Sequence, residues 1–240
     1  MRSIWIALAL PFVVAPAFGS DTTINCTSPT TCQNQFASVS EDAVAAIDYK
    51  ALEPAASTGL VSLGIGVVGT YVPVKKSDWS GVTSENVSGI GAVGLQVLKG
   101  LPFDIDLGAF YSAVPTTSIK LYGGEIRYAI LSGSAVSPAL SIGGSYVKLT
   151  GVDHLSLSTK SADLRASKGF PFLTPYVGVG YVWGDSNPEN VPPLHDVKVN
   201  KTKAYLGARI SLGFFDIVPE VGEVGDNILY NLKAGFSFSL

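Results

Sequence analysis

The last thirteen residues, 228–240, read ILYNLKAGFSFSL, and their side chains alternate between two kinds. One set is apolar and consists of Ile228, Tyr230, Leu232, Ala234, Phe236, Phe238 and Leu240. The other set is mostly small or polar, with Leu229, Asn231, Lys233, Gly235, Ser237 and Ser239. Because successive side chains of a β-strand point to opposite faces, this pattern predicts a strand with one apolar face. A soluble sandwich also alternates, but small polar residues and glycines that face inward in many strands favour a closed barrel surrounded by lipid.

The same two-residue period continues upstream as far as Gly59. It predicts nine further strands, at 59–74, 87–98, 103–114, 118–130, 135–149, 155–166, 173–183, 201–213 and 216–222. Two of these segments need special features. In the sixth, the apolar residues have odd numbers up to Leu157 and even numbers from Ala162 onward. This change of face predicts a β-bulge near Lys160. The ninth contains Pro219, which cannot donate to a ladder, and a closed barrel has no edge strand to accommodate it. We therefore predict a transmembrane antiparallel up-and-down β-barrel of about ten strands, with eight or twelve as alternatives.

The connections between the predicted strands differ in length. The long ones, 75–86 and 184–200, follow odd-numbered strands, whereas the connections after even-numbered strands are short. This asymmetry is typical of outer-membrane barrels, which have short periplasmic turns and longer external loops. An even number of strands then puts both chain termini on the periplasmic side.

The N-terminal residues 1–19 have the features of a signal peptide. Arg2 supplies a positive charge, residues 4–14 are apolar, and Ala17-Phe18-Gly19 fits a cleavage site. In the polar stretch that follows, Cys26 and Cys32 are the only cysteines, and their spacing in an exported chain predicts one small-loop disulfide. Residues 39–52 are predicted to form a short helix, within a periplasmic leader that covers residues 20–58. Many glycines face inward and leave room in the lumen, which could hold water, a thin pore, or this helix folded back as a plug.

Composition excludes several classes of protein. Only 15% of the residues are charged while 47% are hydrophobic, which is unusual for a soluble cytosolic enzyme. After the N-terminus there is no apolar run of about 20 residues, so a bundle of transmembrane helices is excluded. A net charge of -3 argues against a nucleic-acid partner. The histidine and cysteine spacing predicts no metal site, and no motif predicts a cofactor.

From Gly59 onward the chain resembles the bacterial outer-membrane β-barrel proteins as a broad class. The resemblance rests on the export signal, residues 2–19, and on the closing alternation Tyr230-x-Leu232-x-Ala234-x-Phe236-x-Phe238-x-Leu240. Such proteins commonly end in Phe, whereas this chain ends in Leu240. The resemblance implies insertion into outer-membrane lipid by the barrel-assembly machinery, with periplasmic chaperones on the way. It implies no substrate.

If the apolar side chains of each strand face lipid, the side chains that alternate with them face the lumen. The charged residues among the latter predict a lumen network of Asp104, Asp106, Glu125, Arg127, Asp163, Arg165, Arg209, Glu220 and Lys233. Such a network either fixes the barrel register through ion pairs or forms a charged constriction that filters solutes. Aromatic residues near the outer strand ends predict an interfacial girdle of Tyr71, Tyr111, Tyr146, Tyr181 and Trp183, with ligand stacking as the alternative.

These patterns favour a non-enzymatic outer-membrane barrel with a structural or narrow-pore role. One alternative is a surface recognition protein that binds its partner through the external loops 75–86 and 184–200. A second alternative is a hydrolase at the barrel rim, acting on lipid or peptide through His154 or His195 with a nearby serine.

Overall fold

The computed structural model describes residues 29–83, 87–134 and 136–239. The predicted signal peptide and Cys26 lie outside the described residues, so the peptide and the Cys26–Cys32 disulfide stay predictions. Cys32 is buried in the first helix.

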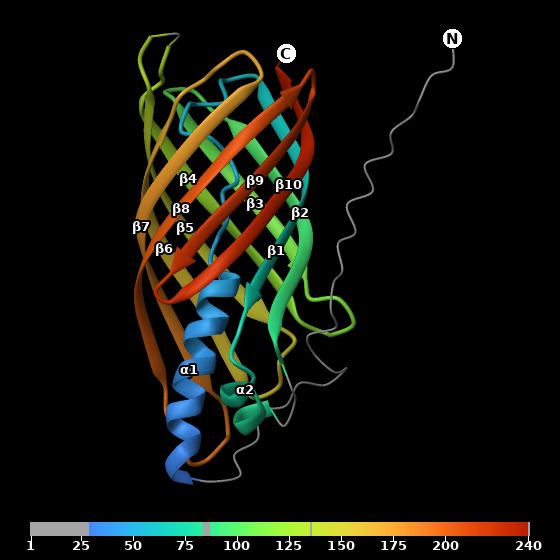
Figure 1. The fold of residues 1–240 in the computed structure, drawn as a ribbon, viewed down its shortest axis with the longest axis vertical. Helices are drawn as coiled ribbons and strands as arrows, with labels where there is room; N and C mark the ends of the chain where they lie inside the picture. Colours follow the sequence, from blue (N-terminus) through green and yellow to red (C-terminus); the bar gives the residue numbers. More distant parts are fainter. Residues whose placement is uncertain (1–28, 84–86, 135, 240) are drawn as a thin grey trace, which may run out of the picture.

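Ten antiparallel strands form one closed barrel (Figure 1), in which each strand pairs with its neighbours in the chain and β1 pairs with β10. The strands are β1 Ser62–Pro73, β2 Gly89–Gly100, β3 Ile105–Ala113, β4 Lys120–Leu131, β5 Ala139–Thr150, β6 Leu155–Ser167, β7 Leu173–Pro188, β8 Val197–Leu212, β9 Phe215–Val224 and β10 Asn227–Ser239. Two helices complete the fold, α1 Pro29–Ile47 and α2 Lys76–Thr83. The predicted fold class is confirmed, with ten strands and not eight or twelve.

Apolar side chains cover the outside of the barrel. On β7, Val177, Val179 and Trp183 are exposed, whereas Tyr176 and Val182, which point to the opposite face, are buried. The same alternation holds on the other strands, and the lumen side carries the buried charges. Within the described residues there is no second sheet for these exposed apolar residues to pack against, because all ten strands belong to one closed sheet. An outer surface of this kind suits the acyl chains of a bilayer.

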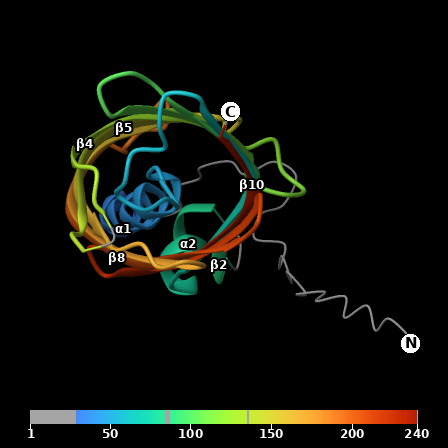
Figure 2. The same ribbon diagram turned by 90° about the horizontal axis from the view of Figure 1, so that it is seen from above.

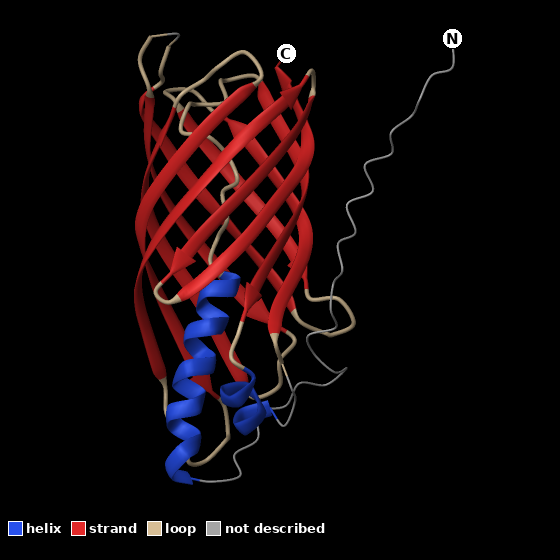
Figure 3. Cartoon of the chain, in the orientation of Figure 1, coloured by secondary structure: helices blue, strands red, loops and turns tan. Residues whose placement is uncertain are grey.

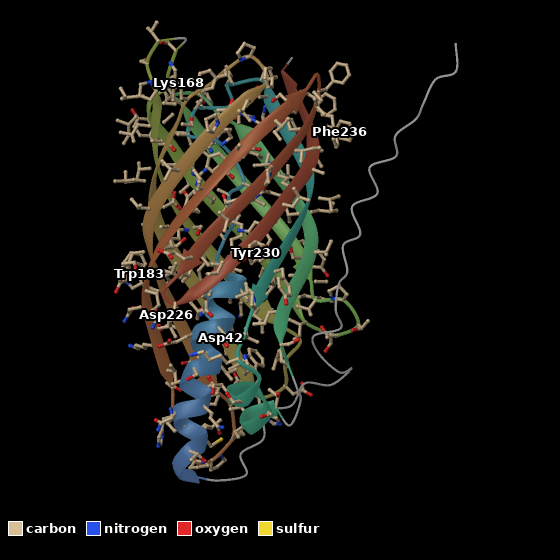
Figure 4. The ribbon with its side chains drawn as sticks, viewed as in Figure 1. Asp42, Lys168, Trp183, Asp226, Tyr230 and Phe236 are labelled. Atoms are coloured by element: carbon tan, nitrogen blue, oxygen red, sulfur yellow. The ribbon has the colours of Figure 1, made fainter. Side chains whose placement is uncertain are left out.

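Aromatic residues border this apolar surface at both ends. Tyr71 lies opposite Tyr230, and Tyr111 lies opposite Tyr122, all four with exposed rings. On β7 the rings of Tyr181 and Trp183 are 5.0 Å apart. A second exposed group, which the sequence reading missed, lies at the other end and contains Phe103, Phe170, Phe172, Phe214 and Phe236. Figure 4 shows Trp183 and Phe236 on the outside, in opposite halves of the barrel.

The predicted bulge near Lys160 is wrong, because β6 keeps one continuous register with both β5 and β7. The parity of its apolar residues changes for a different reason. Leu157 points inward like Asp163, but it lies where the lumen is filled by apolar side chains of α1. The register shift of this region occurs instead in the β4–β5 pair, between Ala129 and Leu131.

Pro219 is accommodated inside the closed ladder. It lies opposite Leu232 of β10, and its ring is exposed on the outer surface. On its other side, the paired residues of β8 and β9 pass from Gly207–Glu220 directly to Ile210–Ile217. The register is the same before and after this gap. The N–H that proline lacks therefore interrupts the β8–β9 ladder locally and does not shift the pairing of the two strands.

The helix α1 is displaced relative to the predicted range, 39–52. It begins ten residues earlier, at Pro29, because Cys32, Phe36 and Val39 continue the buried face of the helix toward the N-terminus. It ends at Ile47, where the Lys50 ammonium donates to the carbonyls of Ala45 (3.0 Å) and Ala46 (3.3 Å) and so caps the C-terminus. No helix in the described ranges is long and apolar enough to cross a membrane.

The course of the chain before β1 was also predicted wrongly. Both helices lie at the barrel end that carries the connections after odd-numbered strands, here called the long-loop end. From Ile47 the chain runs through the lumen (Figure 3) to the opposite, short-turn end, where β1 begins and β10 finishes. Seen along the barrel, α1 lies within the ring of strands (Figure 2). Pro29 and Ser239 therefore lie at opposite ends of the barrel, and residues 29–58 are not a leader on the short-turn side.

The two predicted long loops are mostly ordered structure. Within 75–86, residues 76–83 form α2, which packs against α1. Within 184–200, β7 continues to Pro188 and β8 starts at Val197, so only residues 189–196 connect them. These strands project beyond the others and contact α1, β8 through its packing against the helix and β7 through the Ser186 hydroxyl, which accepts from Ser40.

We predict that a charged residue introduced on the outer apolar surface destabilises the protein, whereas the same residue in a turn does not. Val179→Arg, at a residue that is 56% exposed in the middle of β7, should lower the free energy of unfolding in lipid vesicles by about 2–4 kcal/mol. Val136→Arg is the control, because Val136 is 92% exposed in a short turn that water reaches. Urea titration followed by tryptophan fluorescence measures both. Equal, small effects for the two variants would contradict a lipid-facing surface.

Candidate functional site

The middle of the lumen is occupied by residues 48–58, here called the lumen segment. This stretch has no regular secondary structure, yet Asp48, Tyr49, Leu52, Glu53 and Ala55 are all buried. Buried backbone without a ladder needs other hydrogen-bond partners. The barrel wall supplies these partners through charged side chains, which makes this layer the candidate functional site.

Two acidic residues of the lumen segment pair with lysines and an arginine of the wall. The Glu53 carboxylate accepts from the Lys233 ammonium and lies 3.3 Å from the Arg209 guanidinium. The Lys203 ammonium lies between Asp48 of the segment, at 3.1 Å, and Asp163 of the wall, at 3.2 Å. The segment is thus joined to β8 and β10 by charge pairs that are largely shielded from solvent, and Lys203 extends this network to Asp163 of β6.

Arg127 holds the backbone of the lumen segment. Its guanidinium donates to the carbonyls of Pro54 (2.7 Å) and Ala56 (3.3 Å), and it pairs with Asp106 at 2.6 Å. Asp106 in turn accepts from the backbone N–H of Thr58 at 3.1 Å. Every one of these groups is on the segment or on the inner face of β3 and β4.

Arg165 plays the corresponding part on β6. It donates to the Glu53 carbonyl (3.0 Å), to the Tyr205 hydroxyl (2.9 Å) and to the carboxylates of Glu125 (3.1 Å) and Asp163 (3.2 Å). A buried guanidinium is costly unless its fixed fork of donors is satisfied. Here the fork reaches both the wall and the segment, so it fixes their relative position.

Most of the predicted lumen residues lie in this layer, with one exception. Asp106, Glu125, Arg127, Asp163, Arg165, Glu220 and Lys233 are buried on the inner face, and Arg209 is partly exposed. Asp104 does not belong to the network. It is exposed, with a φ of 59°, in the turn before β3, where the strand parity used to assign it does not apply.

Glu220 has a different environment from the paired carboxylates. It accepts from the Tyr176 hydroxyl at 2.8 Å and from the Asn231 amide at 3.0 Å, and it makes no ion pair within 4.0 Å in the described residues. It therefore belongs to the network through neutral donors.

The sequence reading missed the half of the network that comes from the lumen segment. Asp48 and Lys50 fall in the predicted helix 39–52 and Glu53 in the predicted leader, and neither prediction pairs them with the charges of the wall. Lys203 was missed as well, although it has the same inward parity on β8 as Tyr205 and Arg209, and that parity is the signal that could have identified it.

A second, apolar layer lies toward the long-loop end. There α1 and α2 pack into the barrel mouth, and buried side chains such as Phe36, Val44, Trp79, Val182 and Leu157 form the largest apolar cluster. The Trp79 indole donates to Asp42 of α1 at 2.9 Å, and burial raises the pKa of the Asp42 carboxyl. The lumen is therefore filled by two chemically distinct layers.

The two histidines do not form a catalytic arrangement in the described part of the chain. The His154 ring bonds the backbone carbonyl of Glu189 at 2.9 Å. His195 uses its backbone N–H and carbonyl to bond the Gln33 side chain of α1. No serine hydroxyl or carboxylate is placed against either imidazole in these contacts. Among the described residues there is also no group of three or more His, Cys, Asp or Glu side chains that could hold a metal.

The contacts of Arg127 predict a large effect of truncating it. Arg127→Ala should lower the free energy of unfolding by about 3–5 kcal/mol, because Asp106 then stays buried without its cation. Replacing both partners, as in Arg127→Met with Asp106→Leu, should recover most of this loss. Urea unfolding in vesicles gives both values. A loss below about 1 kcal/mol for Arg127→Ala, the range of an exposed pair, would contradict the buried geometry.

No known protein family model matches the sequence. No curated protein matches it either. Among solved structures, the chain is similar to the N-terminal β-barrel domain of Pseudomonas aeruginosa OprF, with 16% identity, 75% of this chain and 99% of that chain covered, and a TM-score of 0.40. It is also similar to the outer membrane protease OmpT of Escherichia coli, with 8% identity, coverage of 75% and 96%, and a TM-score of 0.39. The KdgM porin shows 11% identity, coverage of 72% and 99%, and a TM-score of 0.36. The solved structures that this chain resembles are thus outer-membrane β-barrels with different roles.

Proposed function

We propose that this protein is a non-enzymatic barrel of the bacterial outer membrane whose lumen is closed by its own N-terminal segment. The apolar outer surface with aromatic residues at both ends supports the membrane location. The observation that carries the proposed closure is the burial of the lumen segment, with its ion pairs to two strands of the wall, β8 and β10.

The spaces beside residues 48–51 of the lumen segment are small, whereas a larger opening of about 570 Å³ borders Ala56 and Arg209 toward the short-turn end. Two cavities beside the lumen segment have volumes of about 20 and 30 Å³. Such volumes hold one or two water molecules, since a water needs at least about 10–15 Å³ of this kind of space. Passage of a solute therefore requires the lumen segment to move, which favours a structural role over a permanently open pore.

The proposed orientation places the long-loop end outside the cell and the short turns in the periplasm, as in other outer-membrane barrels. In this orientation α1 and α2 form part of the external surface, and the lumen segment crosses the membrane inside the barrel. Delivery to this membrane by a signal peptide, periplasmic chaperones and the barrel-assembly machinery belongs to the same proposal.

The two alternative functions gain little support. A recognition protein needs free external loops, but α2 packs on α1 and most of 184–200 is paired in β7 and β8. A rim hydrolase needs a nucleophile against an activated histidine, and the described contacts of His154 and His195 provide none.

Closure of the lumen predicts the electrical behaviour of the purified protein. The mature protein in planar bilayers should show no discrete conductance steps, whereas a variant that lacks residues 20–52 should show them. The heat-dependent gel mobility of folded barrels confirms that each variant is folded. Equal, steady conductance of the intact protein and the folded deletion variant would contradict the proposed closure.

The orientation predicts which residues can be labelled on intact cells. A membrane-impermeant maleimide should label Asn34→Cys, at an exposed position of α1, and should not label Ser132→Cys, at an exposed short turn. The unsubstituted protein gives the background from Cys26 and Cys32. Both variants should react in lysed cells. Labelling of Ser132→Cys alone on intact cells would contradict the proposed orientation and indicate the opposite one.

A further inference from the structure

The apolar layer at the long-loop end contains a cavity of about 60 Å³. It lies between α1, α2 and the inner wall, and its lining includes Phe36, Ile47, Trp79, Ala92, Leu149 and Leu157. Protein cores rarely contain voids much larger than one water molecule, and this one has several times the space that a water needs. Apolar cavities of this kind stay dry and bind apolar molecules. The cavity is thus a candidate ligand site, separate from the charged layer.

The shape of the cavity indicates a slender ligand. Its lining follows α1 from Phe36 to Ile47, which is a length of about 16 Å at the helical rise of 1.5 Å per residue. A cavity of about 60 Å³ that extends over this length has a small cross-section. A long, thin, apolar space suits an unbranched hydrocarbon chain better than a compact ring.

Four of the five side chains with polar groups that line the cavity, those of Ser40, Trp79, Thr83 and Ser186, have hydrogen-bond partners in the protein. The Ser40 hydroxyl donates to the Ser186 hydroxyl at 2.9 Å, and the Thr83 hydroxyl donates to the Trp79 carbonyl at 2.9 Å. A polar ligand would have to replace these bonds, whereas an apolar ligand leaves them intact. The chemistry of the lining therefore selects for hydrocarbon.

The wall separates the cavity from the surrounding bilayer. The strands that line it pair continuously, with β4, β5 and β6 in register through Leu121–Leu149 and Leu149–Leu157. The acyl chain of a membrane lipid would have to pass through this ladder while its headgroup stayed in the membrane. A free chain that enters from the long-loop end meets no such barrier.

We propose that this cavity binds the hydrocarbon chain of a free fatty acid. The inference rests on the proposed function only for the orientation, which places the cavity at the external face. Binding itself is measurable whatever the orientation, and the cysteine labelling described above tests the orientation separately.

Trp79 provides a direct probe, because its buried indole lines the cavity. The mature protein with Trp183→Phe, in phosphatidylcholine vesicles, leaves Trp79 as its only tryptophan, since Trp5 lies in the predicted signal peptide. Titration with stearic acid brominated in mid-chain should quench Trp79 fluorescence saturably, because bromine quenches only at short range. Vesicles made with mid-chain brominated phosphatidylcholine should leave Trp79 unquenched.

Two variants that fill the cavity from opposite sides test the site. Ala43→Leu on α1 and Ala92→Leu on β2 should each weaken the binding of brominated stearic acid about tenfold or more, which is about 1.4 kcal/mol of binding free energy, because the added side chain occupies the space of the ligand. Ala37→Leu on α1 is the matched control, since Ala37 does not line the cavity, and it should bind like the parent.

Three results would overturn the inference. They are the absence of saturable quenching in the folded parent, equal quenching by the brominated lipid, and unchanged affinity in both filling variants. None of these results would affect the conductance test, so failure of this site is distinguishable from failure of the proposed closure.

Discussion

The structure depends on one constraint: inside hydrocarbon, every backbone N–H and C=O group must find its partner within the protein. A sheet meets this constraint only by closing on itself, as β1 does by pairing with β10. In a closed barrel, the side chains on one face of every strand contact lipid and those on the other face line an enclosed lumen. The apolar and aromatic outer surface and the charged inner surface are both consequences of that arrangement.

The enclosed lumen creates the second problem, because charges on its wall are largely removed from water. Wall residues such as Arg127 and Arg165 solve it by bonding the carbonyls of a segment that has no ladder of its own. The wall charges and the segment therefore depend on each other. At the long-loop end the same space is filled mainly by the apolar faces of α1 and α2. This division separates the layer that closes the barrel from the layer that contains the proposed ligand cavity.

The barrel could be predicted from the sequence because its signal is local. Alternation along each strand, such as that of residues 228–240, needs no knowledge of distant residues. It also placed most of the charges that it named on the inner face, although Asp104 lies in a turn and Lys203 was not named. The placement of the lumen segment could not be predicted in this way. Glu53 contacts Lys233, which is 180 residues away, and nothing near Glu53 indicates that its partner faces a barrel lumen. Likewise, the parity change at Leu157 indicated a bulge only because the apolar filling of that barrel end was unknown.

The most direct test of this account is a crosslink between the lumen segment and the wall. Leu52 packs with Val218 of β9 inside the barrel. With Leu52→Cys and Val218→Cys in the folded protein in vesicles, a short bis-maleimide should join the two positions, and cleavage between them should leave the fragments linked. The pair Leu52→Cys with Val221→Cys, whose wall position faces outward, should not be joined. Linkage of neither pair, or of the outward pair alone, would contradict a lumen closed by its own N-terminal segment.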